Sequence, residues 1–401
     1  MKWNKIFRVR AVAAASLLAL VFSLPAAYGQ ARSDAELDRL RESVQKKLNE
    51  FYSAGEFPGA TIGFVLPDGR SASVSVGFSD TENKTPLRPT DKLQAGSIGK
   101  TYAAAAILQA AQDGKLNLDD KIEKWLGGES WFNRLPNAKD ITLRMLMNHS
   151  SGIPEHVLEK QFIEALKKNP DRVWKPEEML AYIFDRPPLF AANKGWAYAD
   201  TNYIVAGMVF ERATKKNLYD EITRRILRPL GLKHTVPADK RVIPGLVNGY
   251  SSSDGPFGFG GKVIRDGKFV INPQFEWTGG GFASTPEDLA RWAKAMYEGK
   301  VFNTQMLGEM LNGVDTSGGR GAGGKYGLAC QMRPSEWGET LGHSGFFPGY
   351  ISNMEYFPQY KIAVAVQVNT DDGRRLKRPF RQFVIETVRI ILSDAAVKKA
   401  A

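Results

Sequence analysis

Residues 96–108 have the sequence GSIGKTYAAAAIL and predict the central element of the fold. Alanine favours helix, and its small side chain lets neighbouring elements pack closely on every side, so we expect a buried central helix that ends near Gly114. Ser97 falls in its first turn, where free N–H groups and the helix dipole favour negative charge. Lys100 follows on the same face, and an adjacent amine can activate a serine hydroxyl. The alternative is an N-capping Ser97 followed by a solvated Lys100, which this motif alone favours.

Strands are predicted near both ends of the chain. Residues 60–66 form a continuous apolar run, residues 67–69 (Pro-Asp-Gly) supply a turn, and residues 71–77 alternate, which is typical of a β-hairpin. Residues 350–357 and 361–368 form a second pair of strands.

Each pair of strands is accompanied by one amphipathic helix, over residues 34–51 and from about Pro379 onward. Residues 91–300 are mostly helical in pattern. We therefore predict a discontinuous α/β domain built from residues 33–90 and 301–395, interrupted by a mainly helical domain over residues 91–300. The active site is expected in the cleft between them.

The first 29 residues differ from the rest. An apolar run over residues 11–24 follows a basic segment, and residues 27–29 (Ala-Tyr-Gly) place small residues where a signal peptidase recognises them. We predict a signal peptide cleaved after Gly29 and a periplasmic or secreted protein. The apolar run is shorter than the ~20 residues that span a bilayer, so no stable membrane anchor is expected after cleavage.

The composition is that of an ordinary globular protein. With 401 residues, 43% hydrophobic and 24% charged, the chain is neither disordered nor collagen-like, and its single cysteine, Cys330, forms no internal disulfide. The net charge of +11 falls to +7 when residues 1–29 are removed. A basic chain raises nucleic acid as a partner, but no motif supports it, and we expect none.

Two further motifs carry candidate chemistry. Residues 196–203 (WAYADTNY) place Tyr198 and Asp200 where both can point into a cleft; alternatively, Tyr198 is a packing residue and Asp200 caps the following helix. In residues 342–350 (GHSGFFPGY), glycines flank His343, which suggests close approach of another group. A lone histidine is more often structural. The other three histidines lack metal-ligand spacing.

Together and in this order, these motifs resemble those of the penicillin-recognising serine hydrolases. The version here is most similar to the class C β-lactamase group, which includes D-alanyl-D-alanine carboxypeptidases, D-aminopeptidases and esterases. The resemblance covers nearly the whole mature chain and extends to other segments, which are residues 57–59, 117–120, 141–146, 149–153, 229–232 and 279–285. It implies an α+β, β-lactamase-like fold, in which an antiparallel sheet flanked by terminal helices carries an inserted all-helical domain.

The resemblance also implies roles for individual residues. Ser97 would form an acyl-enzyme, Lys100 and Tyr198 would share the proton transfers, and His343 would supply charge or a hydrogen bond according to its protonation state. Backbone N–H groups of Ser97 and Phe346 would form the oxyanion hole. The remaining residues expected to bind substrate are Asp200, Ser344 and Gly345. No metal or organic cofactor is implied.

Two residues depart from the family pattern. His343 replaces the usual lysine, as in the peptidase and esterase branch, and Asp200 replaces the usual amide. An ionised aspartate only accepts hydrogen bonds, which disfavours β-lactam binding and leaves room for an ester or an amine-bearing substrate. We expect Asp200 to anchor Lys100 through a charge pair.

The sequence thus predicts an exported serine hydrolase with a small-molecule or peptide substrate, namely a D-amino-acid peptide, a β-lactam or an ester. The leading prediction is a D-alanyl-D-alanine carboxypeptidase, a related D-peptidase or a β-lactamase-related hydrolase, with a carboxylesterase of the same family as the alternative. Two other hypotheses remain. One is an α/β-hydrolase, in which Ser97, Asp200 and His343 have the nucleophile–acid–base order but the preceding strand is poorly supported. The other is a non-catalytic relative that binds peptidoglycan or a partner protein.

Overall fold

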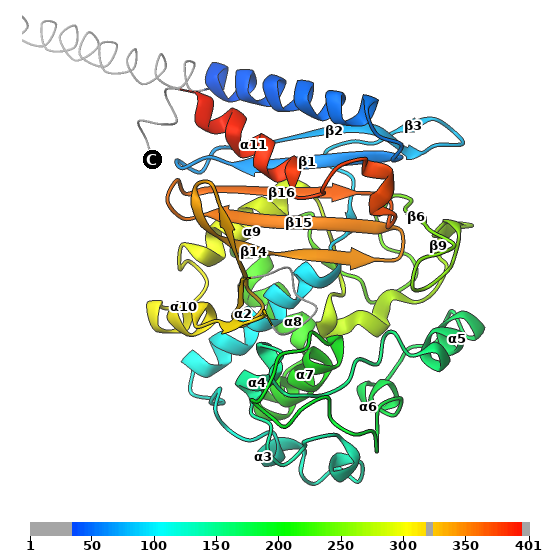
Figure 1. The fold of residues 1–401 in the computed structure, drawn as a ribbon, viewed down its shortest axis with the longest axis vertical. Coiled ribbons are helices and arrows are strands. Elements are labelled where there is room, and N and C mark those ends of the chain that lie inside the picture. The colour runs from blue at the N-terminus through cyan, green and yellow to red at the C-terminus, as the bar shows by residue number, and fades with distance from the viewer. Residues whose placement is uncertain (1–33, 318–323, 395–401) are drawn as a thin grey trace, which may run out of the picture.

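The computed structural model describes residues 34–317 and 324–394, so the predicted signal peptide lies outside the described residues. Within them, the largest element is a nine-stranded antiparallel sheet with the order β11-β12-β13-β14-β15-β16-β1-β2-β3 (Figure 1). Its strands are β1 (Gly59–Val65), β2 (Ser71–Asp80), β3 (Thr85–Pro86), β11 (Val314–Asp315), β12 (Lys325–Tyr326), β13 (Gln331–Ser335), β14 (Gly338–Phe347), β15 (Tyr350–Phe357) and β16 (Ile362–Val368).

Strand β1 joins the two ends of the chain. Ile62 pairs with Val74 of β2 on one side and with Val366 of β16 on the other. The hairpin predicted near the N-terminus and the strand pair predicted near the C-terminus are therefore neighbours in one sheet. The predicted α+β class with an antiparallel sheet is confirmed.

The terminal helices cover one face of this sheet. The helix over residues 34–53 and α11 (Gln382–Ser393) lie side by side there (Figure 1). Side chains alternate across a strand, so Val364 and Val366 of β16 join the core under these helices, whereas Ala363 and Ala365 face the opposite core.

Helix α9 (Pro286–Tyr297) packs on the opposite face against β1, β15 and β16. At Gly63 of β1, an added Cβ atom would come within 2.4 Å of the Pro286 backbone, so the glycine allows the start of α9 to approach the sheet closely. The residues of α9 fall within the helical domain predicted over residues 91–300, yet the helix covers the sheet.

The predicted central helix is confirmed as α2 (Gly99–Gln112), in which every residue from Gly99 to Ala110 is buried. A 3-10 turn, η1 (Gly96–Ile98), precedes it and carries Ser97. Tyr102 stacks on Trp292 of α9 with ring centroids 4.5 Å apart. Trp292 Nε1 donates to Thr101 Oγ1 at 2.7 Å. These contacts hold α2 against α9, the helix that packs on this face of the sheet.

Apart from α7, the remaining elements are short. The other helices are α3 (Glu123–Leu126), α4 (Leu143–Met147), α5 (Lys160–Lys168), α6 (Pro176–Leu180), α7 (Asp200–Thr214), α8 (Leu218–Ile222) and α10 (Thr304–Leu311). The 3-10 and π-helical turns are η2 (Phe132–Arg134), η3 (Thr223–Leu227), η4 (Pro273–Gly279) and η5 (Gly373–Leu376). Small sheets use β4 (Leu93–Gln94), β5 (Val236–Pro237), β6 (Tyr250–Ser251), β7 (Gly261–Lys262), β8 (Ile264–Arg265), β9 (Lys268–Phe269) and β10 (Phe282–Ser284). Over residues 34–317 and 324–394, no helix has the length and apolar character needed to cross a bilayer.

Candidate active site

The backbone around Ser97 lies directly against the end of β14. Gly96 has a φ of +53°, and an added Cβ atom there would lie 2.6 Å from the carbonyl oxygen of Phe346 and 2.7 Å from its nitrogen. An added Cβ atom at Gly345 would lie 2.0 Å from the Ala95 carbonyl oxygen. Both glycines are therefore required by close approach of two backbones. This contact brings the backbone of Phe346 beside the turn that carries Ser97.

The strand immediately before this turn, β4, has only two residues and pairs antiparallel with β10. The nucleophile elbow of an α/β-hydrolase follows a strand of a mainly parallel sheet. The surroundings of Ser97 therefore do not match that alternative.

Lys100 lies beneath Ser97 and is fully buried. Its Nζ donates to Ser97 Oγ at 3.1 Å, to Asp200 Oδ1 and to the Gly279 carbonyl. Burial is the largest single influence and lowers the pKa of Lys100, but the negative charge of Asp200 and the neighbouring acidic groups of Tyr198 and Glu276 together outweigh it, so the net shift is upward. Lys100 is thus an ammonium whose three N–H groups are all used. The charge pair expected between Asp200 and Lys100 is present.

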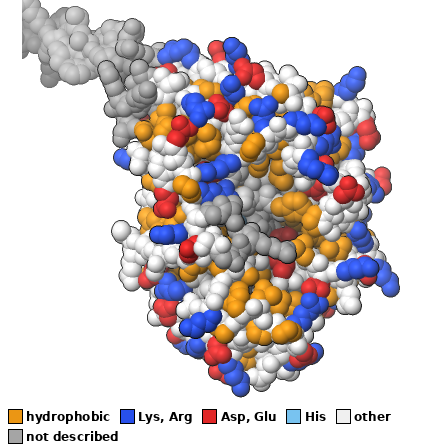
Figure 2. Space-filling view, viewed as in Figure 1, with side chains coloured by type: hydrophobic (Ala, Val, Ile, Leu, Met, Phe, Trp, Pro, Cys, Tyr) orange, Lys and Arg blue, Asp and Glu red, His pale blue; other side chains and the backbone are white. Residues whose placement is uncertain are grey.

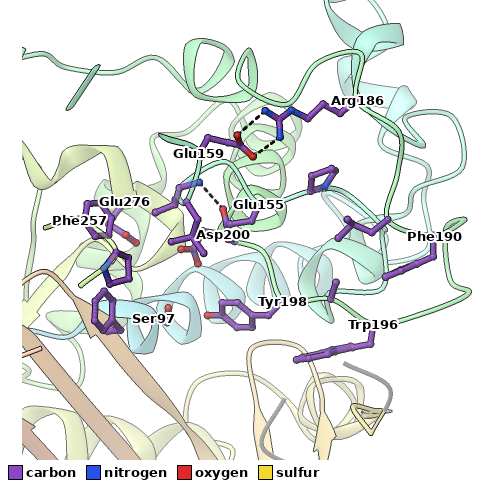
Figure 3. Close-up of a pocket in the computed structure, with 17 residues that line it drawn as sticks. Ser97, Glu155, Glu159, Arg186, Phe190, Trp196, Tyr198, Asp200, Phe257 and Glu276 are labelled. Carbon is purple, nitrogen blue, oxygen red and sulfur yellow. Dashed lines mark hydrogen bonds and ion pairs between the residues drawn. The ribbon is translucent and has the colours of Figure 1, made fainter. Parts of the chain in front are cut away.

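Tyr198 stands in the loop before α7, and its hydroxyl points toward Ser97 (Figure 3). The Lys100 ammonium lies 4.9 Å from the centre of the Tyr198 ring. Burial raises the pKa of Tyr198, and the Lys100 charge offsets this only in part. The phenol is therefore neutral at rest, and a cation stands ready to stabilise its phenolate.

His343 is buried behind these residues and does not line the cavity beside Ser97. Its Nδ1 lies 2.6 Å from the Ser344 carbonyl, which only accepts, so Nδ1 carries the proton. Nε2 therefore accepts from the Tyr326 hydroxyl at 2.8 Å. Burial, followed by the charge of Lys100, lowers the pKa of His343 to about 3. His343 is consequently neutral, which answers the question of charge that the sequence left open.

The same chain of hydrogen bonds continues to a second histidine. Tyr326 Oη accepts from His149 Nε2 at 3.3 Å, and His149 Nδ1 accepts from Asn202 Nδ2 at 3.0 Å. Asn202 is oriented by Ser151, whose hydroxyl donates to its Oδ1 at 2.5 Å. Burial lowers the pKa of His149 well below its ordinary value. The Ser344 carbonyl sets which ring nitrogen of His343 carries the proton, and this in turn sets the hydrogen-bond directions of Tyr326 and His149.

Ser344 and Gly345, both expected to bind substrate, lie in β14 away from the cavity lining. The Ser344 hydroxyl is within 3.3 Å of Arg333 and of Gln331, on the neighbouring strand β13. Gly345 packs on Ala95, as described above. The structure thus brings Ser97, Tyr198, Asp200 and Phe346 to one cavity and places the other predicted residues behind its wall.

That cavity has a volume of about 930 Å³. Figure 2 shows hydrophobic side chains gathered to the right of the centre and in the lower part of this face. The apolar residues that line the cavity are Pro154, Val157, Leu158, Leu189, Phe190, Trp196, Ala197, Pro256, Phe257 and Phe346. Leu158 and Leu189 are more than half exposed. The rim is therefore apolar and open to an apolar group of a ligand.

The floor of the cavity is acidic, which sequence analysis missed. Glu155 and Glu276 line it together with Asp200 (Figure 3). Burial, followed by the charge of Asp200, raises the pKa of Glu155 to about 7 and raises the pKa of Glu276 well above its ordinary value. The signal for Glu155 was its place just after the 149–153 segment, whereas nothing local marks Glu276.

Comparisons with known proteins agree with this architecture. A family model described as Beta-lactamase matches residues 41–386. Penicillin-binding protein 4* of Bacillus subtilis (strain 168) is 24% identical over 315 residues, which cover 74% of this chain and 65% of that protein. The chain therefore spans slightly less than two thirds of that relative.

Solved structures of similar fold include two enzymes whose names specify the D configuration. A D-stereospecific amidohydrolase from Streptomyces sp. is 26% identical with a TM-score of 0.70, over 84% of this chain and 97% of that one. The D-amino acid amidase from Ochrobactrum anthropi SV3, complexed with D-phenylalanine, is 24% identical with a TM-score of 0.76, over 88% and 99% of the two chains. The β-lactamase-like fold expected from the sequence is thereby confirmed.

Proposed function

Because the chain belongs to the Beta-lactamase family of serine hydrolases, we propose that it hydrolyses amides or short peptides of D-amino acids that carry a free α-amino group. The observation that carries this proposal is the charge of the cavity. Among the described residues, its floor holds the carboxyl groups of Glu155, Asp200 and Glu276. The Lys100 cation is paired with Asp200, and Arg186 on the wall is paired with Glu159. The D configuration is taken from the named activities of the two solved relatives.

The same charge distribution argues against substrates with a carboxylate beside the scissile bond, such as β-lactams and peptides ending in D-alanyl-D-alanine. Lys100 is already paired with Asp200. His343, at the position where a permanent cation would serve such a carboxylate, is buried and neutral. Desolvating a substrate carboxylate beside Asp200, where the Lys100 cation is already paired, is costly. Among the activities expected from the sequence, D-peptidase activity is thus favoured over carboxypeptidase and β-lactamase activity.

In the proposed mechanism, the Tyr198 phenol first loses its proton to solvent, a step that the neighbouring Lys100 cation favours. Ser97 Oγ then attacks the substrate carbonyl while its own proton passes to the Tyr198 phenolate. Lys100 holds its own proton, stabilises that phenolate and orients Oγ. The backbone N–H groups of Ser97 and Phe346 receive the oxyanion; removing one such donor typically costs about 3 kcal/mol. Tyr198 then donates its proton to the leaving amine, and water releases the acid by the reverse sequence.

A carboxylesterase remains the second candidate, because the rim is apolar and Asp200 offers no hydrogen to a substrate amide. A non-catalytic role is not favoured, because it does not require the hydrogen bond from Lys100 to the Ser97 hydroxyl.

We also propose that the protein is exported, with residues 1–29 removed. The basic and apolar segments of these residues support export. N-terminal sequencing of the secreted or periplasmic protein tests the cleavage site after Gly29.

The substrate class is tested by steady-state kinetics with D- and L-phenylalanine p-nitroanilide, p-nitrophenyl butyrate, nitrocefin and a peptide ending in D-alanyl-D-alanine. We expect kcat/KM for the D-anilide to exceed that for the L-anilide, nitrocefin and the peptide by at least about 100-fold. Ser97→Ala should abolish turnover. Faster hydrolysis of nitrocefin or of the peptide would overturn the proposal, and activity on the ester alone would support the carboxylesterase.

A further inference from the structure

Most of the carboxyl groups at the cavity already have partners. Asp200 is paired with Lys100, and Glu159 on the outer wall accepts two hydrogen bonds from Arg186, at 2.5 and 2.7 Å. Glu155 accepts from the backbone N–H of Asp200 at 2.6 Å and from that of Val157 at 2.9 Å. These groups are held by the protein itself.

Glu276 is the exception. Glu276 is 6% exposed and lines the cavity. Its carboxyl group forms no hydrogen bond or ion pair with any of the described residues. A carboxyl group with so little exposure loses most of its hydration, and the nearby charge of Lys100 compensates its ionised form only in part. Such groups in native structures are commonly explained by a ligand or a functional role.

The backbone holds this carboxyl group close to the nucleophile. An added Cβ atom at Gly280 would lie 2.9 Å from Glu276 Oε2 and 2.8 Å from the carbonyl group of Gly96, the residue before Ser97. Glu276 lies in η4, where Trp277 interrupts the turn with a φ of +35°. Figure 3 shows Glu276 on the same side of the cavity as Asp200 and Ser97.

The charges near Glu276 leave room for one cation. Lys100 and Asp200 compensate each other, and two backbone N–H groups favour the ionised form of Glu155. Burial favours the protonated form of Glu276, and repulsion from Asp200 and Glu155 acts in the same direction, while the charge of Lys100 opposes this only in part. An ammonium group beside Glu276 would replace that proton as the compensating charge.

We propose that Glu276 is a specificity-determining residue that receives the α-ammonium group of the substrate. This assignment rests on the proposed function. When the substrate binds as a free amine, the proton of the Glu276 carboxyl group moves to the amine and an ion pair results. When it binds as an ammonium ion, that proton leaves to solvent. In both cases no covalent bond other than O–H and N–H changes.

The test compares two substrates that differ only in the amine: D-phenylalanine p-nitroanilide and 3-phenylpropanoic acid p-nitroanilide. Glu276→Gln keeps the shape of the side chain but cannot carry a negative charge. We expect it to lower kcat/KM at least 10-fold for the amine substrate, chiefly by raising KM, and to change that for the deamino substrate less than 3-fold. Glu159→Gln removes a carboxylate from the same cavity wall and is the matched control, with less than 3-fold effect on either substrate.

Circular dichroism and covalent labelling of Ser97 by an activated ester confirm that each variant is folded. If Glu276→Gln does not fold, Glu276→Asp, which withdraws the carboxylate by one methylene, should raise KM for the amine substrate only. Equal losses for both substrates in Glu276→Gln, or an equally large loss in Glu159→Gln, would overturn the assignment of Glu276. The proposed function would still stand if the wild-type enzyme prefers the amine substrate. A wild-type enzyme without that preference would overturn both.

Discussion

Replacing Asp200 by asparagine tests the charge pair that organises the site. Lys100 is fully buried, and the side chain of Asp200 is 16% exposed. Removing one partner of a buried pair costs roughly 3–5 kcal/mol, because the remaining charge is left uncompensated. The partial exposure of Asp200 places the expected loss at about 3 kcal/mol. At about 2 °C per kcal/mol for a chain of this size, the melting temperature should fall by about 6 °C.

The same substitution should change the pH dependence of catalysis. Burial lowers the pKa of Lys100, and Asp200 is the main charge that raises it, so Asp200→Asn should lower that pKa. A neutral Lys100 can itself accept the Ser97 proton. The rise of kcat/KM with pH should therefore move to lower pH.

The assays are thermal unfolding followed by circular dichroism and kcat/KM measured from pH 5 to pH 10. Asp185→Asn is the matched control, since the pair of Asp185 with Arg134 is more than half exposed on both sides and should contribute at most about 1 kcal/mol. A melting temperature for Asp200→Asn equal to that of the control, together with an unshifted pH profile, would refute the reasoning.

Three further predictions concern the surroundings of Ser97. Tyr326→Phe leaves the ring nitrogens of His343 and His149 without their shared partner, so the free energy of unfolding measured in urea should fall by roughly 1–3 kcal/mol; an unchanged value would contradict the network. Both histidines have pKa values below those of the unfolded chain, which therefore binds protons that the native state excludes. Stability should accordingly be full above about pH 6.5 and decline toward pH 3, and urea unfolding at pH 7, 5 and 4 measures this. Gly96→Ala should lower kcat at least 100-fold with a smaller effect on KM, because its Cβ atom would meet the Phe346 backbone; wild-type kcat would exclude the close approach.

Local patterns predict much of this fold. The β1–β2 hairpin combines an apolar run, a Pro-Asp-Gly turn and an alternating run, and each of these acts over a few residues. The alanine-rich α2 is buried on all sides because its small side chains permit it. By contrast, α9 covers the sheet although its sequence neighbours suggest the helical domain, since an amphipathic pattern does not specify which core a helix joins.

The candidate site, like the fold, could be predicted from the sequence only in part. The pairing of Asp200 with Lys100 followed from residue type, because an aspartate in place of an amide has one obvious partner. The neutral state of His343 did not follow, since it depends on burial and on Tyr326, which no motif connects to it. Glu276 has no local signal at all. Its importance arises only where η4 passes beside Gly96 and Gly280.

The position of β1 between β2 and β16 has a consequence for the order of events during synthesis. Ala60 of β1 pairs with Val368 of β16. A nascent chain therefore contains Ser97 and Lys100 long before β16, the second partner of β1, has left the ribosome. Phe346, which stands opposite Ser97, also emerges late. A contact between such distant segments cannot form until both have been synthesised, and the long loop between them must then be closed. The complete site therefore requires nearly the whole chain, and a growing polypeptide that lacks β14 is not yet an enzyme.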